Sequence, residues 1–369
     1  MKLVFWICAA LTAYTYFGYA LWLWLQVCAR RRLIVQRDIV PSASVILAAR
    51  NEEANLAAKL KNLQLLDYPQ DRLQIVVVSD GSTDRTAEIV REQGSAIIPV
   101  ILDRPCGKAF ALNEAVRRAS GEILFFQDAR QRVEPGALRA LVRCFADETV
   151  GAVSGELLLE AVEGETSSDA LGIYWKIEKM VRKLESASGS AVGATGAIYA
   201  IRRELYTEIP SGTILDDVFV PMHVARAGKR VVFQPEAIAR DRIFVQKGKE
   251  FSRKVRTLTG NYQLLRIAPW LLSLRNPLLF RFISHKLLRL IAPVLLILML
   301  VASAVSRAPE MRILLALQVV FYGLAALGMF RGPATRFRLV TIAHTFVILN
   351  LAAVVAFFNF VARRDEVWV

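Results

Sequence analysis

The sequence predicts an α/β domain with a mostly parallel sheet, attached to one apolar helix near the N-terminus and about three near the C-terminus. Two observations predict this class. Short apolar runs, such as residues 43–48 and 73–78, end in polar residues and lead into amphipathic stretches, which is the pattern of βα units with buried strands. The chain is also 54% hydrophobic with a mean hydropathy of +0.38, and the excess lies at its two ends.

The N-terminal segment, residues 1–32, predicts a membrane-spanning helix with a basic flank. Residues 3–28 are apolar, and Arg30, Arg31 and Arg32 follow directly. A signal peptide has a shorter apolar core and a small-residue cleavage site, so an uncleaved span is the favoured interpretation. Because basic residues concentrate on the cytoplasmic side, the flank predicts an outside N-terminus and a cytoplasmic middle of the chain.

The C-terminal segment, residues 287–369, predicts about three further spans. They lie near residues 290–305, 313–330 and 339–361. The basic loop at residues 331–338 favours the cytoplasmic side, while Arg363 and Arg364 leave the side of the C-terminus open. Polar residues within the spans predict hydrogen bonds between helices, with a polar path for an acceptor as the alternative. These residues are Gln318, His344 and Asn350.

Residues 41–265 form the predicted α/β domain, and residues 266–286 follow it as an amphipathic segment. This segment mixes apolar residues with Arg281, His285 and Lys286, which favours helices at the membrane interface, with a buried linker as the alternative. The formal net charge is +14, but the sequence does not interleave aromatic and basic residues as the stacking platforms of nucleic-acid-binding proteins do. Membrane orientation and anionic lipid explain the charge, so the bilayer is the expected partner and nucleic acid is not.

Polar residues after the predicted strands indicate an active site. Asp80 ends an apolar run, and Gly81 follows it, with Ser82 or Thr83 as a helix N-cap. Ligands of open α/β sheets bind at the carboxyl ends of the strands. The upstream run leads in the same way into Asn51 and an amphipathic helix, so two βα units lie side by side.

Several short motifs follow one another in a specific order. They are Asn51-Glu52, the Asp80-Gly81-Ser82-Thr83-Asp84 run, Gly107-Lys108 with Asn113, Asp128-Ala129-Arg130, residues 193–203, and Leu215-Asp216-Asp217. In this order the chain resembles the membrane-embedded members of glycosyltransferase family 2, which include cellulose, chitin and hyaluronan synthases, over roughly residues 41–265. The resemblance implies a GT-A-type nucleotide-sugar-binding domain.

The resemblance also implies an inverting transfer of a hexose or N-acetylhexosamine from a nucleotide sugar, UDP-linked, to a membrane-associated polysaccharide or lipid. The implied location is the plasma (inner) membrane, with the catalytic domain in the cytoplasm. The alternative is a catalytically inactive nucleotide-sugar-binding subunit of a membrane polysaccharide-synthesis complex. Release of free nucleotide on donor addition separates the two.

By resemblance, eight residues bind the donor. They are Arg50, Glu52, Asp80, Lys108, Asp128, Arg130, Arg253 and Arg256. For Lys108 the alternative is a solvated residue in the first turn of a helix. Arg253 and Thr257 stand where many processive members carry glutamine and tryptophan, so the chain departs from the motif of a polymer channel.

One acidic motif departs from the family. Asp128 matches the first acid of the family's Asp-any-Asp motif, but Arg130 replaces the second, which commonly ligates a divalent cation bridging the diphosphate. Two arrangements therefore stay open: Mg²⁺ or Mn²⁺ held by Asp128 and other oxygens, or Arg130 neutralising the phosphates itself. A third possibility is that the protein is an inactive enzyme.

The pair Asp216 and Asp217 stands where the family carries its catalytic carboxylates, and by resemblance Asp217 is the general base, with Asp216 supporting it. The alternative is that both only cap a helix. By resemblance, the glycine-rich stretch before it forms a floor beneath the donor sugar and the acceptor, with Gly193, Gly196 and Tyr199. By itself this stretch is typical of a turn into a strand. His223 can complete a metal site, but a lone histidine is more often packed or solvated.

Overall fold

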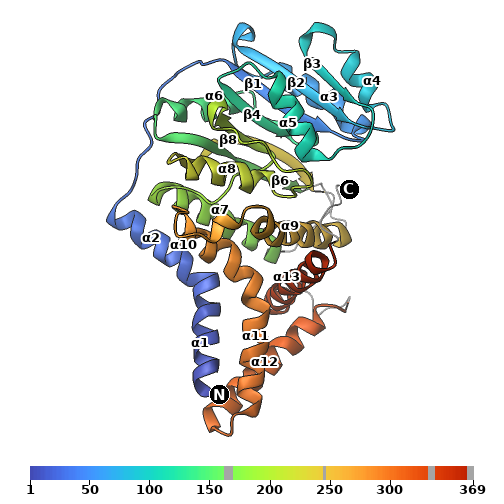
Figure 1. The fold of residues 1–369 in the computed structure, drawn as a ribbon. Coiled ribbons are helices and arrows are strands. Elements are labelled where there is room, and N and C mark those ends of the chain that lie inside the picture. Colours follow the sequence, from blue (N-terminus) through green and yellow to red (C-terminus); the bar gives the residue numbers. More distant parts are fainter. Residues whose placement is uncertain (162–168, 244–246, 331–336, 364–369) are drawn as a thin grey trace.

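The computed structural model describes residues 1–161, 169–243, 247–330 and 337–363 (Figure 1). A domain built on one sheet lies at one end of the molecule, and a group of long helices extends from its lower side. Parts of two basic stretches, residues 331–336 and Arg364, fall outside the described residues. The predicted loop at residues 331–338 is therefore described only at its end.

The described residues form one eight-stranded sheet with the order β3-β2-β1-β4-β7-β6-β8-β5. The strands are β1 (Ala43–Ala49), β2 (Leu73–Asp80), β3 (Ile98–Leu102), β4 (Ile123–Asp128), β5 (Arg132–Val133), β6 (Val150–Ala161), β7 (Ile198–Arg202) and β8 (Arg230–Ile243). Strands β3, β2, β1 and β4 run parallel, as do β6 and β8. Strand β7 is antiparallel to both of its neighbours, and β5 is antiparallel to β8. The predicted α/β class is confirmed, with a mixed sheet.

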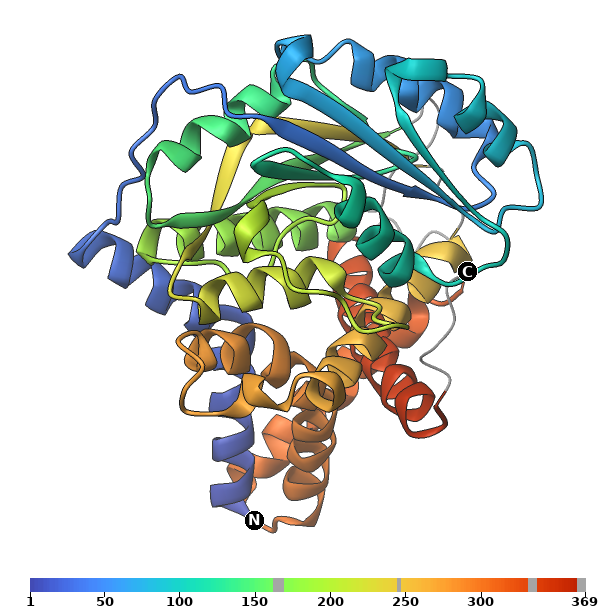
Figure 2. The same ribbon diagram turned by 45° about the horizontal axis from the view of Figure 1, so that its top comes forward.

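Helices cover both faces of this sheet (Figures 1 and 2). Those on one face are α3 (Glu53–Gln64), α4 (Thr86–Arg91) and α6 (Ala137–Arg143), and those on the other are α5 (Lys108–Arg118) and α8 (Asp216–Arg226). Successive residues of a strand point to opposite faces, so Val45 and Leu47 pack with α3 while Ile46 and Ala48 pack on the side of α5. Burial on both faces explains why the strands read as continuous apolar runs.

Further helices connect the sheet to the lower part of the molecule. They are α7 (Asp169–Ser188), α9 (Lys247–Ile267) and α10 (Leu279–Phe282), with the short 3₁₀ helices η2 (Gln70–Arg72), η3 (Gly94–Ala96), η4 (Cys144–Ala146), η5 (Arg203–Leu205) and η6 (Pro269–Leu272) elsewhere. The lower helices are α1 (Lys2–Ala13), α2 (Tyr19–Ala29), α11 (Leu288–Val305), α12 (Pro309–Leu327) and α13 (Arg338–Val361), with the π-helical turns η1 (Tyr14–Gly18) and η7 (Ile283–Leu287).

Four continuous helical stretches within the described residues are long and apolar enough to cross a membrane. They are Lys2–Ala29, Leu279–Val305, Pro309–Leu327 and Arg338–Val361. One N-terminal and three C-terminal candidate spans are thus found, as the sequence predicts. The second begins at Leu279, inside the segment predicted to lie at the interface, because α10, η7 and α11 form one continuous helix.

The polar residues at depth in these spans bond between helices, as predicted. Gln318 Nε2 donates to Ser303 Oγ at 3.0 Å, which joins α12 to α11. His344 Nδ1 lies 3.2 Å from the carbonyl oxygen of Ala325, and Tyr16 Oη donates to Asn350 Oδ1 at 3.1 Å. Such bonds satisfy groups that lipid cannot.

Candidate active site

Three parallel strands bring the predicted donor residues to one edge of the sheet. Strand β1 pairs with β2 and with β4 in register, so that Ala48 lies beside Asp128. Arg50 and Glu52 follow β1, Asp80 ends β2, and Asp128 ends β4. These residues therefore start from adjacent strand ends, where α/β sheets bind ligands.

Asp80 is fully buried and holds the loop that leads to α5. Its two carboxylate oxygens accept hydrogen bonds from the backbone N–H groups of Cys106 at 2.7 Å and Gly107 at 2.9 Å. Gly81 has a φ of +55°, and a Cβ there would lie 2.2 Å from the carbonyl carbon of Arg104, so only glycine fits. In this arrangement Asp80 positions Lys108, the first residue of α5.

The loops after β1 and β2 are bonded to each other. Asn51, with a φ of 53°, accepts from the backbone N–H of Thr83 at 2.9 Å through its side-chain oxygen. The backbone N–H of Glu52 donates to Thr86 Oγ1 at 2.8 Å, and its carboxylate accepts from Asn55 Nδ2 at 2.7 Å. The Asn-Glu and Asp-Gly-Ser-Thr-Asp motifs therefore form one unit of structure.

Lys108 joins two acidic elements that are distant in sequence. Its Nζ lies 3.1 Å from Asp128 Oδ1 and 3.3 Å from Asp216 Oδ1. Burial alone would lower the pKa of Lys108, but the carboxylates of Asp128, Asp216 and Asp217 raise it well above its usual value. The ammonium group stays charged and links the end of β4 to the start of α8.

Asp217 is partly buried beside Asp216 in the first turn of α8. Burial and the Asp216 carboxylate raise the pKa of Asp217 to about 6, against the opposing charges of Lys108, Lys286 and Arg182. Asp217 Oδ2 accepts from the backbone N–H of Gly196 at 3.2 Å. A carboxylate with a pKa near the operating pH suits a general base.

The glycine-rich stretch lies directly under this carboxylate. A Cβ at Gly196 would sit 3.2 Å from Asp217 Oδ2, and one at Gly193 would sit 3.1 Å from Val218 Cγ2, so both glycines allow close approach. Tyr199 lies deeper, because it is fully buried on β7 and stacks on Phe126 with ring centroids 4.6 Å apart. Within the part of the chain described here, its hydroxyl has no hydrogen-bond partner.

Arg130 pairs with Asp241, which lies outside the motifs and outside the acidic group, our name for Asp128, Asp216 and Asp217 around Lys108. Its Nε donates to Asp241 Oδ1 at 3.0 Å and its Nη2 to Asp241 Oδ2 at 2.5 Å. Gln131 Nε2 donates to the same carboxylate at 3.0 Å. Asp241 is buried, so the charge of Arg130 is matched by a fixed carboxylate, and its action on a phosphate remains a prediction.

The acidic residues allow a test of the predicted divalent cation. Among the described residues, no group of three or more His, Cys, Asp or Glu side chains is arranged to hold a metal ion. Asp128 offers one carboxylate, whose side chain is 37% exposed and pairs with Lys108 through Oδ1. Because Mg²⁺ is often held by one or two carboxylates plus substrate phosphates, Asp128 fits a cation that a diphosphate completes.

The remaining predicted residues lie apart from the acidic group. Arg253 and Arg256 are exposed on α9, with no contact to these carboxylates among the interactions described. His223 packs between Phe219 and Trp270, with centroid distances of 4.5 and 4.9 Å. Burial lowers the pKa of His223, which is consistent with a packed histidine.

Sequence reasoning missed a buried lysine beside the end of β4. Lys59 is 1% exposed, and its Nζ donates to Gln127 Oε1 at 2.9 Å and to the carbonyl oxygen of Gln131 at 2.7 Å. These two residues bracket Asp128 and Arg130, so Lys59 fixes the turn that carries both. The signal was a lysine inside the apolar stripe of α3.

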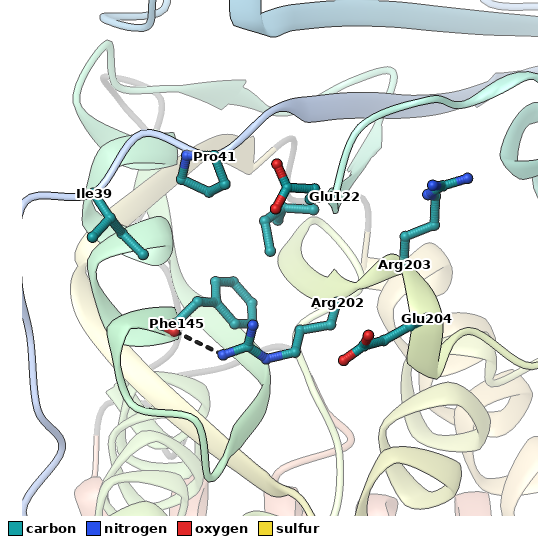
Figure 3. A pocket seen from close by; sticks show the side chains of 8 residues that line it. Ile39, Pro41, Glu122, Phe145, Arg202, Arg203 and Glu204 are labelled. Carbon is teal, nitrogen blue, oxygen red and sulfur yellow. Dashed lines mark hydrogen bonds between the residues drawn. The ribbon is translucent and has the colours of Figure 1, made fainter.

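A cavity of about 260 Å³ lies at the opposite edge of the sheet, near the amino end of β4 (Figure 3). Arg202 extends across it and donates to the backbone oxygens of Phe145 at 2.7 Å and Val150 at 2.9 Å. Its wall includes Glu122 and Glu204 but none of the predicted site residues. The cavity is therefore separate from the acidic group.

Comparison with known proteins gives a consistent picture. A family model described as "Glycosyltransferase like family 2" matches residues 41–262. A probable glycosyltransferase of Bacillus subtilis, YdaM, is 30% identical over 221 residues, which are 54% of this chain and 50% of that protein. The beta-monoglucosyldiacylglycerol synthase of Synechocystis is 35% identical over 152 residues, or 38% of this chain and 32% of that protein. The match spans no more than half the length of these relatives.

One solved structure aligns over almost the whole chain. It is the mannosyltransferase PcManGT from Pyrobaculum calidifontis in complex with GDP-Man and Mn²⁺, with a TM-score of 0.72 over 97% of this chain and 99% of that one. The two sequences are 24% identical, so the likeness speaks for the fold. The sheet domain and the helices below it thus recur together.

Proposed function

Because the chain belongs to glycosyltransferase family 2, we propose that it transfers a hexose or N-acetylhexosamine from a UDP-linked sugar to a membrane-associated lipid or polysaccharide, with inversion. The observation that carries this proposal is the acidic group at the start of α8. There Asp217 lies over Gly196, next to Asp216, and Lys108 links the pair to Asp128. The group joins a candidate base to a candidate phosphate-binding cation.

In the proposed reaction Asp217 removes the proton of the acceptor hydroxyl. The acceptor oxygen attacks the anomeric carbon from the face opposite the leaving group, and a new C–O bond forms there. The bond from that carbon to the phosphate oxygen breaks, and its electron pair leaves with the nucleoside diphosphate. Attack from the opposite face inverts the anomeric centre, and the proton ends on Asp217.

Lys108 is the proposed partner of the departing diphosphate. Its ammonium group is held in place by two carboxylates, so it is oriented before the donor binds. Asp128 would hold a divalent cation together with the donor phosphates, and a cation bound there would add charge stabilisation to the leaving group. Arg50 and Glu52 are proposed to line the nucleotide side of the same sheet edge, and the fully buried Asp80 to hold the donor-binding loop beneath it.

A second candidate function is a nucleotide-sugar-binding subunit without catalysis. It is favoured by the replacement of an acid by Arg130, whose charge is already matched by Asp241. In that case the donor binds but no nucleotide is released with any acceptor or metal.

We also propose that the catalytic domain faces the cytoplasm at the plasma membrane. The support is the basic flank Arg30, Arg31 and Arg32, which follows the first candidate span directly, since such flanks stay in the cytoplasm.

The test uses the full chain in lipid nanodiscs against a panel of nucleotide sugars, with free nucleotide and product mass measured. We expect one donor to release nucleotide in an acceptor-dependent way and Asp217→Asn to abolish that release while donor binding survives. The matched control is Asp71→Asn, an aspartate whose side chain is 81% exposed away from the site. Loss of donor binding in Asp217→Asn would make Asp217 a binding residue, and retained release would remove it from the mechanism.

A further inference from the structure

A continuous set of contacts runs from Asp217 down to the helices below the sheet. Gly196, which donates to Asp217, is followed back along the chain by Thr195, whose hydroxyl accepts a hydrogen bond from Arg182 Nη1 of α7. Arg182 Nε lies 3.8 Å from Glu178 Oε1, one turn earlier on the same helix. The floor of the site is thus bonded to α7.

The helix that begins the second candidate span is bonded to α7 as well. His285 Nε2 lies 3.1 Å from Glu178 Oε1, and its Nδ1 lies 2.8 Å from Glu185 Oε1. Arg289 Nη1 donates to Glu178 Oε2 at 2.7 Å. Three cations, Arg182 of α7 with Lys286 and Arg289 of the second candidate span, therefore gather around Glu178. We call them the cationic group.

Lys286 makes no direct bond to the carboxylates of this group among the described residues. Within the described ranges its Nζ makes no hydrogen bond and no ion pair, although the side chain is partly buried. The nearby acids are already used: Glu178 bonds His285 and Arg289, while Glu185 bonds His285 and accepts from Tyr19 Oη at 2.6 Å. The charges of Glu178 and Glu185 act favourably on Lys286, but the three cations outnumber these two carboxylates, so the partly buried group favours an added anion.

The position of Lys286 indicates where this anion comes from. Lys286 belongs to η7, inside the stretch Leu279–Val305 that is apolar enough to cross a membrane. Its charge also reaches Asp217, where it opposes the effects of burial and Asp216. A ligand that contacts both Asp217 and η7 has one end at the candidate catalytic carboxylate and the other end in lipid.

We propose that Lys286, together with Arg182 and Arg289, binds a phosphate group of the lipid acceptor and so holds the acceptor hydroxyl near Asp217. This proposal rests on the proposed function, and it narrows the acceptor to phosphate-bearing lipids over neutral glycolipids. The guanidinium groups supply paired donors to phosphate oxygens, and the ammonium group supplies a point charge.

The experiment measures binding of farnesyl phosphate and of farnesol to the full chain in detergent micelles by calorimetry. We expect farnesyl phosphate to bind at least about tenfold more tightly than farnesol, and Lys286→Gln to remove that difference. Lys286→Arg should retain it. The matched control is Lys183→Gln, which removes an exposed charge on α7 next to Arg182 and should change binding less than about twofold.

Three results would overturn the proposal: equal binding of the phosphate and the alcohol, an equal loss in Lys183→Gln, or a loss of UDP binding in Lys286→Gln. The second would indicate general attraction to an anionic surface, and the third would assign the cationic group to the donor. If UDP itself does not bind the wild-type chain, the proposed function fails, while the farnesyl phosphate result stands independently. Melting temperatures show that the variants are folded.

Discussion

Asp217 should set the acid limb of the pH profile of acceptor-dependent turnover. Burial and Asp216 raise its pKa to about 6. A general base works in its charged form, so activity is present above this pKa and is lost as the pH falls through it. At about one pH unit below the pKa, only about one tenth of the carboxylate is ionised, and turnover should fall about tenfold from its plateau.

The neighbouring charges predict how variants move this limb. Asp216→Asn removes the like charge, so the limb should shift to lower pH, whereas Lys108→Met removes an opposing charge and should shift it to higher pH. Asp217→Asn should also raise the melting temperature near neutral pH. The raised pKa means that the neutral form fits the folded protein better, so this gain should shrink as the pH falls from about 6 to about 4 and be absent below that.

The assay is nucleotide release at saturating donor between about pH 5 and pH 8, with donor binding measured in parallel. A flat profile over this range would refute the role of Asp217 as the base, provided that donor binding is constant. A limb that stays in place in both Asp216→Asn and Lys108→Met would refute the electrostatic reasoning instead. Asp71→Asn is the control that should leave the profile unchanged.

Three other predictions concern separate parts of the chain. Arg130→Ala should lower turnover at least about tenfold, equivalent to roughly 1.4 kcal/mol in the activation barrier, and should raise the requirement for metal. The double variant Arg130→Ala with Asp241→Ala should regain thermal stability but not turnover. If turnover is regained as well, the role of Arg130 is structural only. Burial lowers the pKa of Lys59 to about 7, so the melting temperature of the wild type, relative to that of Lys59→Met, should rise between about pH 7 and pH 9. A difference in melting temperature that stays constant over this range would contradict the prediction. In a cysteine-free background, a cysteine at Ala308 should react with an impermeant reagent in intact cells and one at Leu33 should not; the reverse pattern would place the catalytic domain outside.

The local sequence was sufficient for the strands and for the edge where the polar residues meet. The runs at residues 43–48 and 73–78 form β1 and β2, because strands buried on both faces must be apolar throughout. Parallel pairing then brings Asp80 and Asp128 to one edge without further information. The order of motifs adds Asp217, whose contact with the floor follows from the glycines before it.

Contacts between distant segments were not predictable in the same way. Arg130 and Asp241 are 111 residues apart, and no periodic pattern links a loop residue to one position of a strand. Likewise, the charges of Arg281 and His285 favour a surface segment when read locally. Buried carboxylates on α7 satisfy His285 instead, so the helix of the second span starts earlier than its own sequence suggests.

The packing of α1 has a consequence for how the protein is made. Phe5 packs with Ala302 and Met311, and Thr12 contacts Met299 across 287 residues. On the ribosome, α1 is synthesised first, and its partners emerge only after the whole sheet domain. The stretch Lys2–Ala29, of which α1 is the first part, must therefore be stable as a single span before its partners arrive, and its length and apolarity allow this. Closure of the helix group is then a late step of biogenesis, one that begins when α11 enters the membrane.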